Sequence, residues 1–239
     1  MQPYIVVPAL TIRTPGGELD ESGNARYAQR AARTWVDRFI LSGTTARGYL
    51  MTVQDRSSLV RVWLDHVEPA RLLACCWTRA DVDNAVAHGV TPIAAIPHCH
   101  DDDTALRFFG SLPPGSFIYS HPGNSPTIFD AALCAKASAS GCLPAGAKLS
   151  KQSHHEIAAI RAQAGEDFIV WDGSSRNIAG SLAAGATGVV ATPLSPVPQP
   201  FPPRELSHLQ TILDEIQADL DQLPSRDARS DHLCTLAAT

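Results

Sequence analysis

The chain has 239 residues, of which 44% are hydrophobic and 18% are charged. This composition is typical of a folded globular protein and excludes the polar, highly charged composition of a disordered chain. The 24 acidic residues outnumber the 19 basic ones, so the formal net charge is −5 and no sequence-wide basic field is present to hold a nucleic acid.

Short apolar segments rich in Val, Ile and Phe recur along the chain, and each is followed by a polar or Gly/Pro-containing break and an amphipathic stretch. Short, nearly continuously apolar segments are typical of buried parallel strands. Eight such strands with helical crossovers predict an α/β fold in a single domain, a closed (β/α)8 TIM barrel, with an open doubly wound sheet as the alternative. The predicted strands are Tyr4–Leu10, Phe39–Gly43, Leu72–Trp77, Pro92–Pro97, Ser116–Ser120, Pro144–Leu149, Phe168–Asp172 and Gly188–Thr192.

The segments between these strands carry helix signals. Thr52–Val67 has a broad apolar face, and shorter helical patterns occupy Glu156–Ala164 and Ile178–Ala184. Thr52 and Thr78 are each followed three residues later by an aspartate, which is typical of a capping box at a helix N-terminus.

The C-terminal part is expected to differ from the barrel. Residues 193–203 contain six prolines, which predict an irregular loop. A last long helix is predicted over Glu205–Leu223, and a partly frayed tail is expected after Pro224. The expected organisation is therefore a barrel over residues 1–200 and a reduced C-terminal extension over residues 201–239, with a helix that closes the barrel and a flexible tail.

No apolar stretch approaches the roughly 20 residues that a membrane-spanning helix needs. The N-terminal run from Met1 to Val7 lacks the basic segment and cleavage site of a secretory signal. The six cysteines show no CxxC spacing, and a disulfide framework is not expected in such a chain. These features predict a soluble cytoplasmic protein that does not contact a membrane.

In a (β/α)8 barrel the active site lies at the C-terminal ends of the strands and in the loops that follow them. Polar residues at these places are therefore the first candidates for a functional role. They are Gly43, Thr44 and Thr45 after the second strand, His98, Cys99, His100 and Asp101 after the fourth, Tyr119 to Pro122 on the fifth, Lys148 on the sixth, and Asp172, Gly173 and Ser174 after the seventh.

Lys148 is the sharpest of these candidates, because it lies inside the otherwise small and apolar segment Ala145–Ser150. A lysine amine that the barrel shields from water can be neutral, attack a ketone and form an imine. The alternative is a lysine at the end of a strand that reaches out to solvent. Only two further lysines, Lys136 and Lys151, are present in the chain.

Tyr119 is a second candidate, because a phenol can both donate and accept a hydrogen bond and so pass protons near an imine. An ordinary strand aromatic is the alternative. The Gly43-Thr44-Thr45 segment offers hydroxyls and closely spaced backbone N–H groups that suit a carboxylate, or else forms a simple glycine-containing turn.

The order of these segments resembles the dihydrodipicolinate synthase/N-acetylneuraminate lyase family. The resemblance rests on Gly43-Thr44-Thr45, on Tyr119-Ser120-His121-Pro122 and on Gly146-Ala147-Lys148, and it extends from Ile5 to about Pro198. Leu19-Asp20, the segment Leu50–Arg56 and Gly185-Ala186-Thr187-Gly188 support it.

The resemblance implies a (β/α)8 class I aldolase or lyase that acts on pyruvate or a related 2-keto acid, joins it to an aldehyde or cleaves the product, and needs no cofactor or metal. Lys148 would be the Schiff-base lysine and Tyr119 the proton-transferring phenol, while Thr44 and Thr45 would hold the carboxylate and help to relay protons. The further candidates for substrate binding are Gly43, His98, Asn124 and Gly173. A homo-oligomer, either a dimer or a tetramer, is also implied.

The sequence departs from the family pattern at several positions. The usual Gly-Thr-Thr-Gly-Glu reads Gly-Thr-Thr-Ala46-Arg47, so a cation replaces an acid. Asn124 stands where synthases place an arginine. Without the arginine, a bidentate clamp for a substrate carboxylate is lost. His98 and Cys99 occupy the region where synthases supply a tyrosine to a neighbouring subunit. Dihydrodipicolinate synthase activity itself is therefore not expected, and the shortened C-terminal region argues against the usual tetramer.

Two other functions are compatible with the sequence. A metal-dependent barrel hydrolase or aldolase could use His98, His100 and Asp101, although the run of three aspartates is also typical of a helix start. A barrel that binds a keto acid but has lost productive chemistry is the second alternative, because of the changes at Arg47, Cys99 and Asn124.

Overall fold

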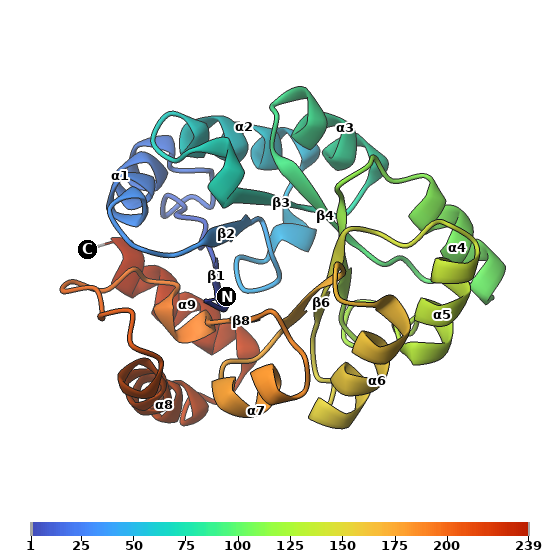
Figure 1. The fold of residues 1–239 in the computed structure, drawn as a ribbon. Coiled ribbons are helices and arrows are strands. Elements are labelled where there is room, and N and C mark those ends of the chain that lie inside the picture. Colours follow the sequence, from blue (N-terminus) through green and yellow to red (C-terminus); the bar gives the residue numbers. More distant parts are fainter. Residues whose placement is uncertain (1, 239) are drawn as a thin grey trace. The chain divides into compact units, whose positions relative to one another are not determined.

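All eight predicted strands are present in the computed structural model, which describes residues 2–238 (Figure 1). The strands follow one another in chain order around a closed sheet, and the paired strands are parallel. The predicted (β/α)8 topology is confirmed, and the open doubly wound sheet is excluded. The strands are β1 (Tyr4–Pro8), β2 (Arg38–Leu41), β3 (Leu72–Cys76), β4 (Thr91–Ala95), β5 (Phe117–Ser120), β6 (Gly146–Leu149), β7 (Ile169–Asp172) and β8 (Gly188–Val190).

Helices connect the strands and follow the last of them. They are α1 (Glu21–Ala32), α2 (Val53–Leu64), α3 (Arg79–Ala87), α4 (Asp102–Gly110), α5 (Ala131–Ala139), α6 (His154–Ala164), α7 (Ile178–Ala183), α8 (Leu206–Asp221) and α9 (Arg226–Ala238). The predicted capping boxes of α2 and α3 are both formed: the hydroxyls of Thr52 and Thr78 accept from the backbone N–H of Asp55 and Asp81, whose carboxylates accept in return.

The chain forms two compact units, each of which has its own packing. The β4–β8 unit comprises residues 2–4 and 92–190 and contains helices α4 to α7. The β1–β3 unit comprises residues 5–91 and 191–238 and contains helices α1 to α3, α8 and α9. The two C-terminal helices therefore belong to the same compact unit as the first three strands.

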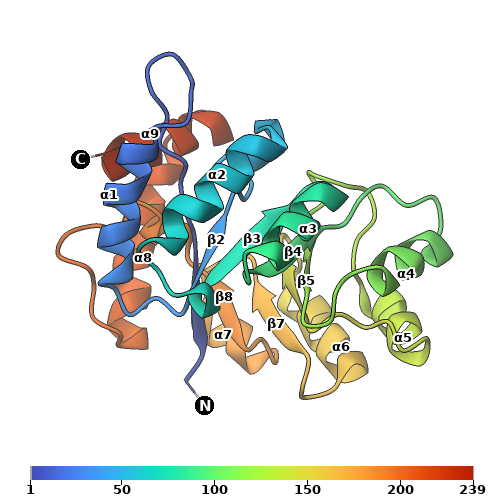
Figure 2. The same cartoon turned by 90° about the horizontal axis from the view of Figure 1, so that it is seen from above.

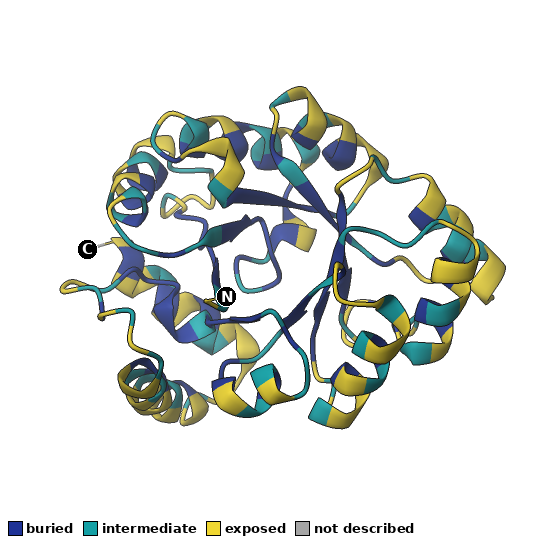
Figure 3. Ribbon diagram, in the orientation of Figure 1, coloured by how far each residue is buried: buried dark blue, intermediate teal, exposed yellow. Residues whose placement is uncertain are grey.

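The core of the β4–β8 unit lies between its strands and the helices that cover them (Figure 3). Ile118, Ala147 and Val170, one from each of β5, β6 and β7, pack in one cluster with side chains of α4, α5 and α6. Because successive side chains of a strand point to opposite faces, this set leaves the alternate residues on the other face of the sheet.

That other face carries a layer of aromatic side chains. Phe117 on β5 stacks on Trp171 on β7, with ring centroids 4.6 Å apart and an interplanar angle of 6°. Gly146 lies between them on β6, and a Cβ there would approach Phe117 Cε1 and the backbone oxygen of Ile169 to 2.5 Å each. The absence of a side chain at position 146 is what lets the two rings meet across the strand.

An aromatic group also organises the core of the β1–β3 unit. Trp63 of α2 contacts Tyr27 of α1 at a centroid distance of 5.4 Å and Phe39 of β2 at 5.3 Å. All three side chains are fully buried. These ring contacts hold α1 and α2 against β2, and they therefore fix the strand from which the loop after β2 begins.

The C-terminal segment differs in part from the expectation. The predicted last helix is confirmed as α8, which begins after Glu205. Residues 226–238, for which the sequence predicts a partly frayed tail, form helix α9. Ser230, Leu233 and Ala237 of α9 lie on one face of the helix and are buried. This burial stabilises a helix whose composition is otherwise polar. Among the described residues, no helix is long and apolar enough to span a membrane.

We predict that Gly146→Ala destabilises the protein, because the added methyl group would collide with Phe117 and with backbone that cannot move aside cheaply. The expected loss is about 1–3 kcal/mol in the free energy of unfolding, measured by urea denaturation. Gly110→Ala is the matched control, since its Cβ would meet only Cys142 Cβ at an ordinary 3.7 Å. Equal stability of the two variants would contradict the close packing of the aromatic layer.

Candidate functional site

Lys148 is buried beside Tyr119 in the β4–β8 unit. Its Cα is in register with Tyr119 on β5 and with Trp171 on β7, so the three side chains share one face of the sheet. Lys148 is 6% exposed and Tyr119 is 4% exposed. Lys148 Nζ lies over the Tyr119 ring, 4.1 Å from its centroid. The alternative of a solvent-directed lysine is therefore wrong.

The environment of the Lys148 amine is aromatic rather than acidic. Within residues 2–238, no carboxylate forms an ion pair with Lys148 Nζ. The amine instead contacts the ring of Tyr119 in the geometry of a cation–π contact. An amine that no carboxylate binds can approach a carbonyl carbon without first breaking an ion pair.

Trp171 is a residue of this site that the sequence analysis did not single out. It is fully buried, and within the described part of the chain its indole Nε1 has no hydrogen-bond partner. Buried indole N–H groups usually have one. The signal that could have found it is its place on β7, in register with Lys148.

His121, which the sequence analysis named only as part of the segment Tyr119–Pro122, also lies next to Tyr119. Its ring lies 5.7 Å from the Tyr119 ring, and its Nδ1 accepts from the backbone N–H of Gly123 at 2.9 Å. A Cβ at Gly123 would come within 2.8 Å of His121 Cε1, so the glycine makes room for the imidazole. Asn124, the exposed residue at the expected arginine position, donates its backbone N–H to His121 O at 2.9 Å.

The Gly43-Thr44-Thr45 segment forms a tight turn in the β1–β3 unit. The carbonyl of Gly43 accepts from the N–H groups of Ala46 and Gly48 at 3.2 and 2.9 Å, and the carbonyl of Thr44 accepts from Arg47 N at 3.0 Å. Thr44 is buried and Thr45 is partly exposed. The glycine-containing turn that the sequence offers as an alternative is therefore present. Binding of a substrate by the hydroxyls of Thr44 and Thr45 belongs to the proposed function.

A buried ion pair anchors the end of this turn. Arg56 of α2 binds Asp81 of α3, with 2.8 Å between Nε and Oδ1, and its Nη1 also donates to the carbonyls of Gly48 and Met51. A Cβ at Gly48 would fall 1.6 Å from the carbonyl oxygen of Ser42. Only glycine therefore permits this close approach, which returns the chain to the end of β2 and defines the shape of the turn.

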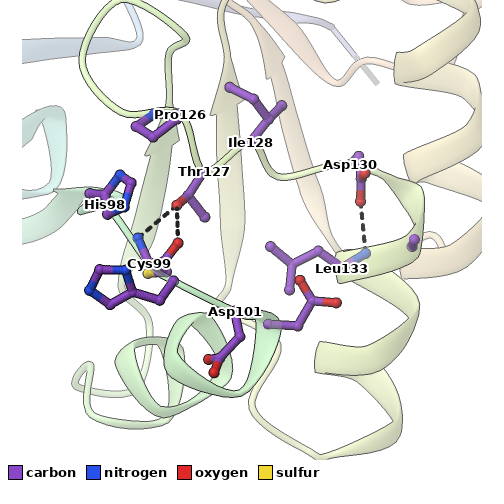
Figure 4. A pocket seen from close by; sticks show the side chains of 11 residues that line it. His98, Cys99, Asp101, Pro126, Thr127, Ile128, Asp130 and Leu133 are labelled. Carbon is purple, nitrogen blue, oxygen red and sulfur yellow. Dashed lines mark hydrogen bonds between the residues drawn. The ribbon is translucent and has the colours of Figure 1, made fainter.

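His98 lies in a pocket between the loops that follow β4 and β5, and Lys148 is not among the residues that line this pocket (Figure 4). The pocket has a volume of about 390 Å³. Cys99 and Thr127 join the two loops, since Cys99 N donates to Thr127 Oγ1 at 2.8 Å. The pocket is lined by His98, Cys99, His100, Asp101, Asp102, Pro126, Thr127, Ile128, Asp130, Ala132 and Leu133.

The metal-site alternative loses support from the geometry of this pocket. The rings of His98 and His100 are 5.1 Å apart, as their spacing suggested. Asp101, however, caps α4 by accepting from Thr104 N at 2.8 Å, which confirms the interpretation of the acidic run as a helix start. Within residues 2–238, no group of three or more His, Cys, Asp or Glu side chains could hold a metal ion.

Asp172 ends β7, the strand that pairs with the strand of Lys148, and Gly173 follows it. Gly173 packs against the β6 turn: its N–H donates to Leu149 O at 2.6 Å, and a Cβ would lie 2.3 Å from Ser150 Oγ. Asp172 is in register with Leu149 on the helix-covered face, where it accepts from Ser181 Oγ of α7 at 2.6 Å. Both residues therefore have packing contacts within the β4–β8 unit.

No protein-family model and no curated protein matches this sequence. Solved structures do share its fold. The 2-keto-3-deoxygluconate aldolase from Picrophilus torridus has a TM-score of 0.80 and 14% identity, over 99% of this chain and 93% of that chain. Dihydrodipicolinate synthase from Thermotoga maritima has a TM-score of 0.74 and 17% identity, over 98% and 80% of the two chains.

A third similar structure contains a ligand. It is a variant of 2-keto-3-deoxygluconate aldolase from Sulfolobus solfataricus in complex with pyruvate, with a TM-score of 0.70 and 17% identity, over 98% of this chain and 78% of that chain. At such identities the likeness establishes a shared fold. The proteins that share it include those of the family that the sequence resembles.

Burial raises the pKa of the Asp172 carboxyl above its ordinary value of 3.8, against the hydrogen bonds from Ser181 and Ser174 N and the charge of His154. The folded state therefore binds the proton more tightly than the unfolded state, and this group's contribution to stability falls as pH rises from 3.8 through the raised pKa. We predict that Asp172→Asn gains stability relative to the natural protein over this window. Urea denaturation from about pH 2.5 to 7 measures the change.

Asp101→Asn provides a control of opposite sign. The hydroxyl and N–H of Thr104 lower the pKa of Asp101, so its carboxylate supports the fold above pH 3.8 and this support is lost as pH falls through the lowered pKa. The Asn variant should lose stability relative to the natural protein as pH rises toward 3.8. The same trend in both variants would contradict the assignment of burial as the cause at Asp172.

Proposed function

We propose that this chain is a class I aldolase or lyase of the dihydrodipicolinate synthase/N-acetylneuraminate lyase family that forms a Schiff base between Lys148 and pyruvate or a related 2-keto acid. The observation that carries the proposal is the position of the Lys148 amine, which is buried over the Tyr119 ring without a carboxylate partner among residues 2–238. The pyruvate complex of the Sulfolobus solfataricus aldolase variant, which shares the fold, supports the choice of substrate.

The proposed reaction begins with attack of the Lys148 lone pair on the keto carbon. The carbonyl oxygen takes up protons and leaves as water, and the C=N bond of the imine takes its place. Tyr119 passes the protons in this step, because a phenol donates and accepts in turn. The protonated imine then draws electrons from the neighbouring carbon, so an enamine forms there by loss of a proton or by cleavage of a carbon–carbon bond.

Thr44 and Thr45 bind the keto-acid carboxylate in this proposal. The role comes from the family resemblance, and it is supported by the tight turn that holds both residues just after β2. The second substrate is an aldehyde that carries no carboxylate of its own, since Asn124 replaces the arginine that would clamp one. His98, Asn124 and Gly173 are the residues proposed to bind the aldehyde. A homo-oligomeric state and a cytoplasmic location are further parts of the proposal.

We predict that borohydride reduction in the presence of pyruvate adds the mass of one reduced pyruvate to Lys148, located by peptide mass spectrometry. Lys148→Ala should abolish the adduct, because no other buried lysine replaces it. Lys151→Ala is the matched control, since Lys151 is exposed and its removal should leave the adduct unchanged. An adduct that persists in Lys148→Ala would overturn the proposal.

Product formation from pyruvate and a series of hydroxylated aldehydes must be assayed separately. An adduct without turnover would identify a keto-acid-binding barrel that has lost productive chemistry.

We predict that Tyr119→Phe slows formation of the adduct by about 10²–10⁴-fold, which is the usual contribution of a positioned acid or base. The ring remains beneath the amine in this variant, so the stability of the protein and the final extent of trapping should change little. The rate of adduct formation is measured by adding borohydride at successive times after mixing with pyruvate. A rate within threefold of the natural protein would exclude proton transfer by Tyr119 as the controlling step.

A further inference from the structure

Arg47, the residue that departs from the family pattern at the end of the Gly-Thr-Thr turn, is bound by the C-terminal helix. Its Nη2 lies 2.8 Å from Asp231 Oδ1 and donates to the carbonyl of Asp227 at 2.8 Å. Its Nε lies 3.3 Å from Asp227 Oδ1. The residue that replaces an acid therefore has two acids of α9 as partners, both within the β1–β3 unit.

Helix α9 is itself anchored at its other end, beside α1 (Figure 2). Leu233 and Ala237 are buried, and the guanidinium of Arg30 on α1 donates to the carbonyl of Ala237. Cys234 Sγ contacts the carbonyl of Thr11 at 3.9 Å. These contacts hold the C-terminal half of α9 against the body of the unit, and the N-terminal half presents Asp227 and Asp231 to Arg47.

The backbone of Arg47 couples this contact directly to the turn. Its φ of 53° lies in the left-handed region, which is unfavourable for a residue with a side chain. Its N–H donates to the carbonyl of Thr44 at 3.0 Å. The ion pairs with α9 supply a reason for this conformation to persist, and they connect α9 to Thr44 through a single residue.

We propose that Arg47 is a positioning residue, through which helix α9 holds the Thr44–Thr45 turn in the shape that binds the keto-acid carboxylate. The inference rests on the proposed function for its ligand, while the coupling between α9 and the turn stands on its own geometry. The guanidinium does not contact the substrate, because its two aspartate partners engage it. Its loss should weaken keto-acid binding more than it slows the chemical step at Lys148.

The test compares Arg47→Asn with the natural protein. Asparagine tolerates the left-handed conformation but removes the charge, so the fold is expected to persist. We expect the apparent Kd for pyruvate, from borohydride trapping over a range of concentrations, to rise by about three- to tenfold. The trapping rate at saturating pyruvate should stay within about twofold, which separates a binding effect from a catalytic one.

A double-mutant cycle identifies α9 as the partner. Asp231→Asn should raise the apparent Kd by a similar factor, and the double variant Arg47→Asn/Asp231→Asn should be no worse than either single variant. Arg79→Glu is the matched control, since Arg79 forms an exposed ion pair with Asp83 on α3, remote in sequence from the turn. Independent, multiplicative effects of the two single variants, or a Kd unchanged in Arg47→Asn, would overturn the proposal.

A second measurement keeps the inference testable if pyruvate is not trapped at all, an outcome that would refute the proposed function alone. Hydrogen exchange of the backbone amides of residues 43–51 reports on the turn without any ligand. Faster exchange in both Arg47→Asn and Asp231→Asn, but not in Arg79→Glu, is the expected result. Unchanged exchange of residues 43–51 in both variants would show that α9 does not hold the turn.

Discussion

The contact between the Lys148 amine and the face of the Tyr119 ring is the interaction on which the proposed chemistry depends. It arises from a simple constraint, since parallel strands in register place side chains of the same parity on one face of the sheet. Lys148, Tyr119 and Trp171 are in register on three neighbouring strands. On the same face of the sheet, the ring of Phe117 stacks on that of Trp171, and the two rings meet because position 146 is glycine. Packing thus creates an aromatic surrounding for the Lys148 amine.

The residues that depart from the family pattern have partners of their own in the structure. Arg47 is held by Asp227 and Asp231, and Cys99 donates its backbone N–H to Thr127 Oγ1. The changed charge at position 47 is therefore paired. The shared fold of aldolases and synthases at low identity is consistent with this, because a (β/α)8 scaffold tolerates change in its loops.

Two kinds of anchoring hold the Gly-Thr-Thr turn. The buried Arg56–Asp81 pair is shielded from solvent and also binds the carbonyls of Gly48 and Met51, so it defines the path of the backbone. The Arg47 contacts lie partly in solvent, where screening makes ion pairs weaker and more easily broken. The turn therefore has one rigid attachment to α2 and α3 and one adjustable attachment to α9.

The sequence by itself determined the strand order and the capping boxes of α2 and α3, and it pointed to Lys148 and Tyr119 as candidates for the site. These depend on local patterns, namely apolar runs, cap spacing and the position of a residue on its strand. Tertiary structure alone decided that Trp171 and His121 lie beside Tyr119 and Lys148, that Gly173 packs against Ser150, and that residues 226–238 form a helix. Each of these depends on a contact between segments distant in the chain, and the burial of Leu233 and Ala237 against the body of the β1–β3 unit outweighs the weak helical signal of a polar tail.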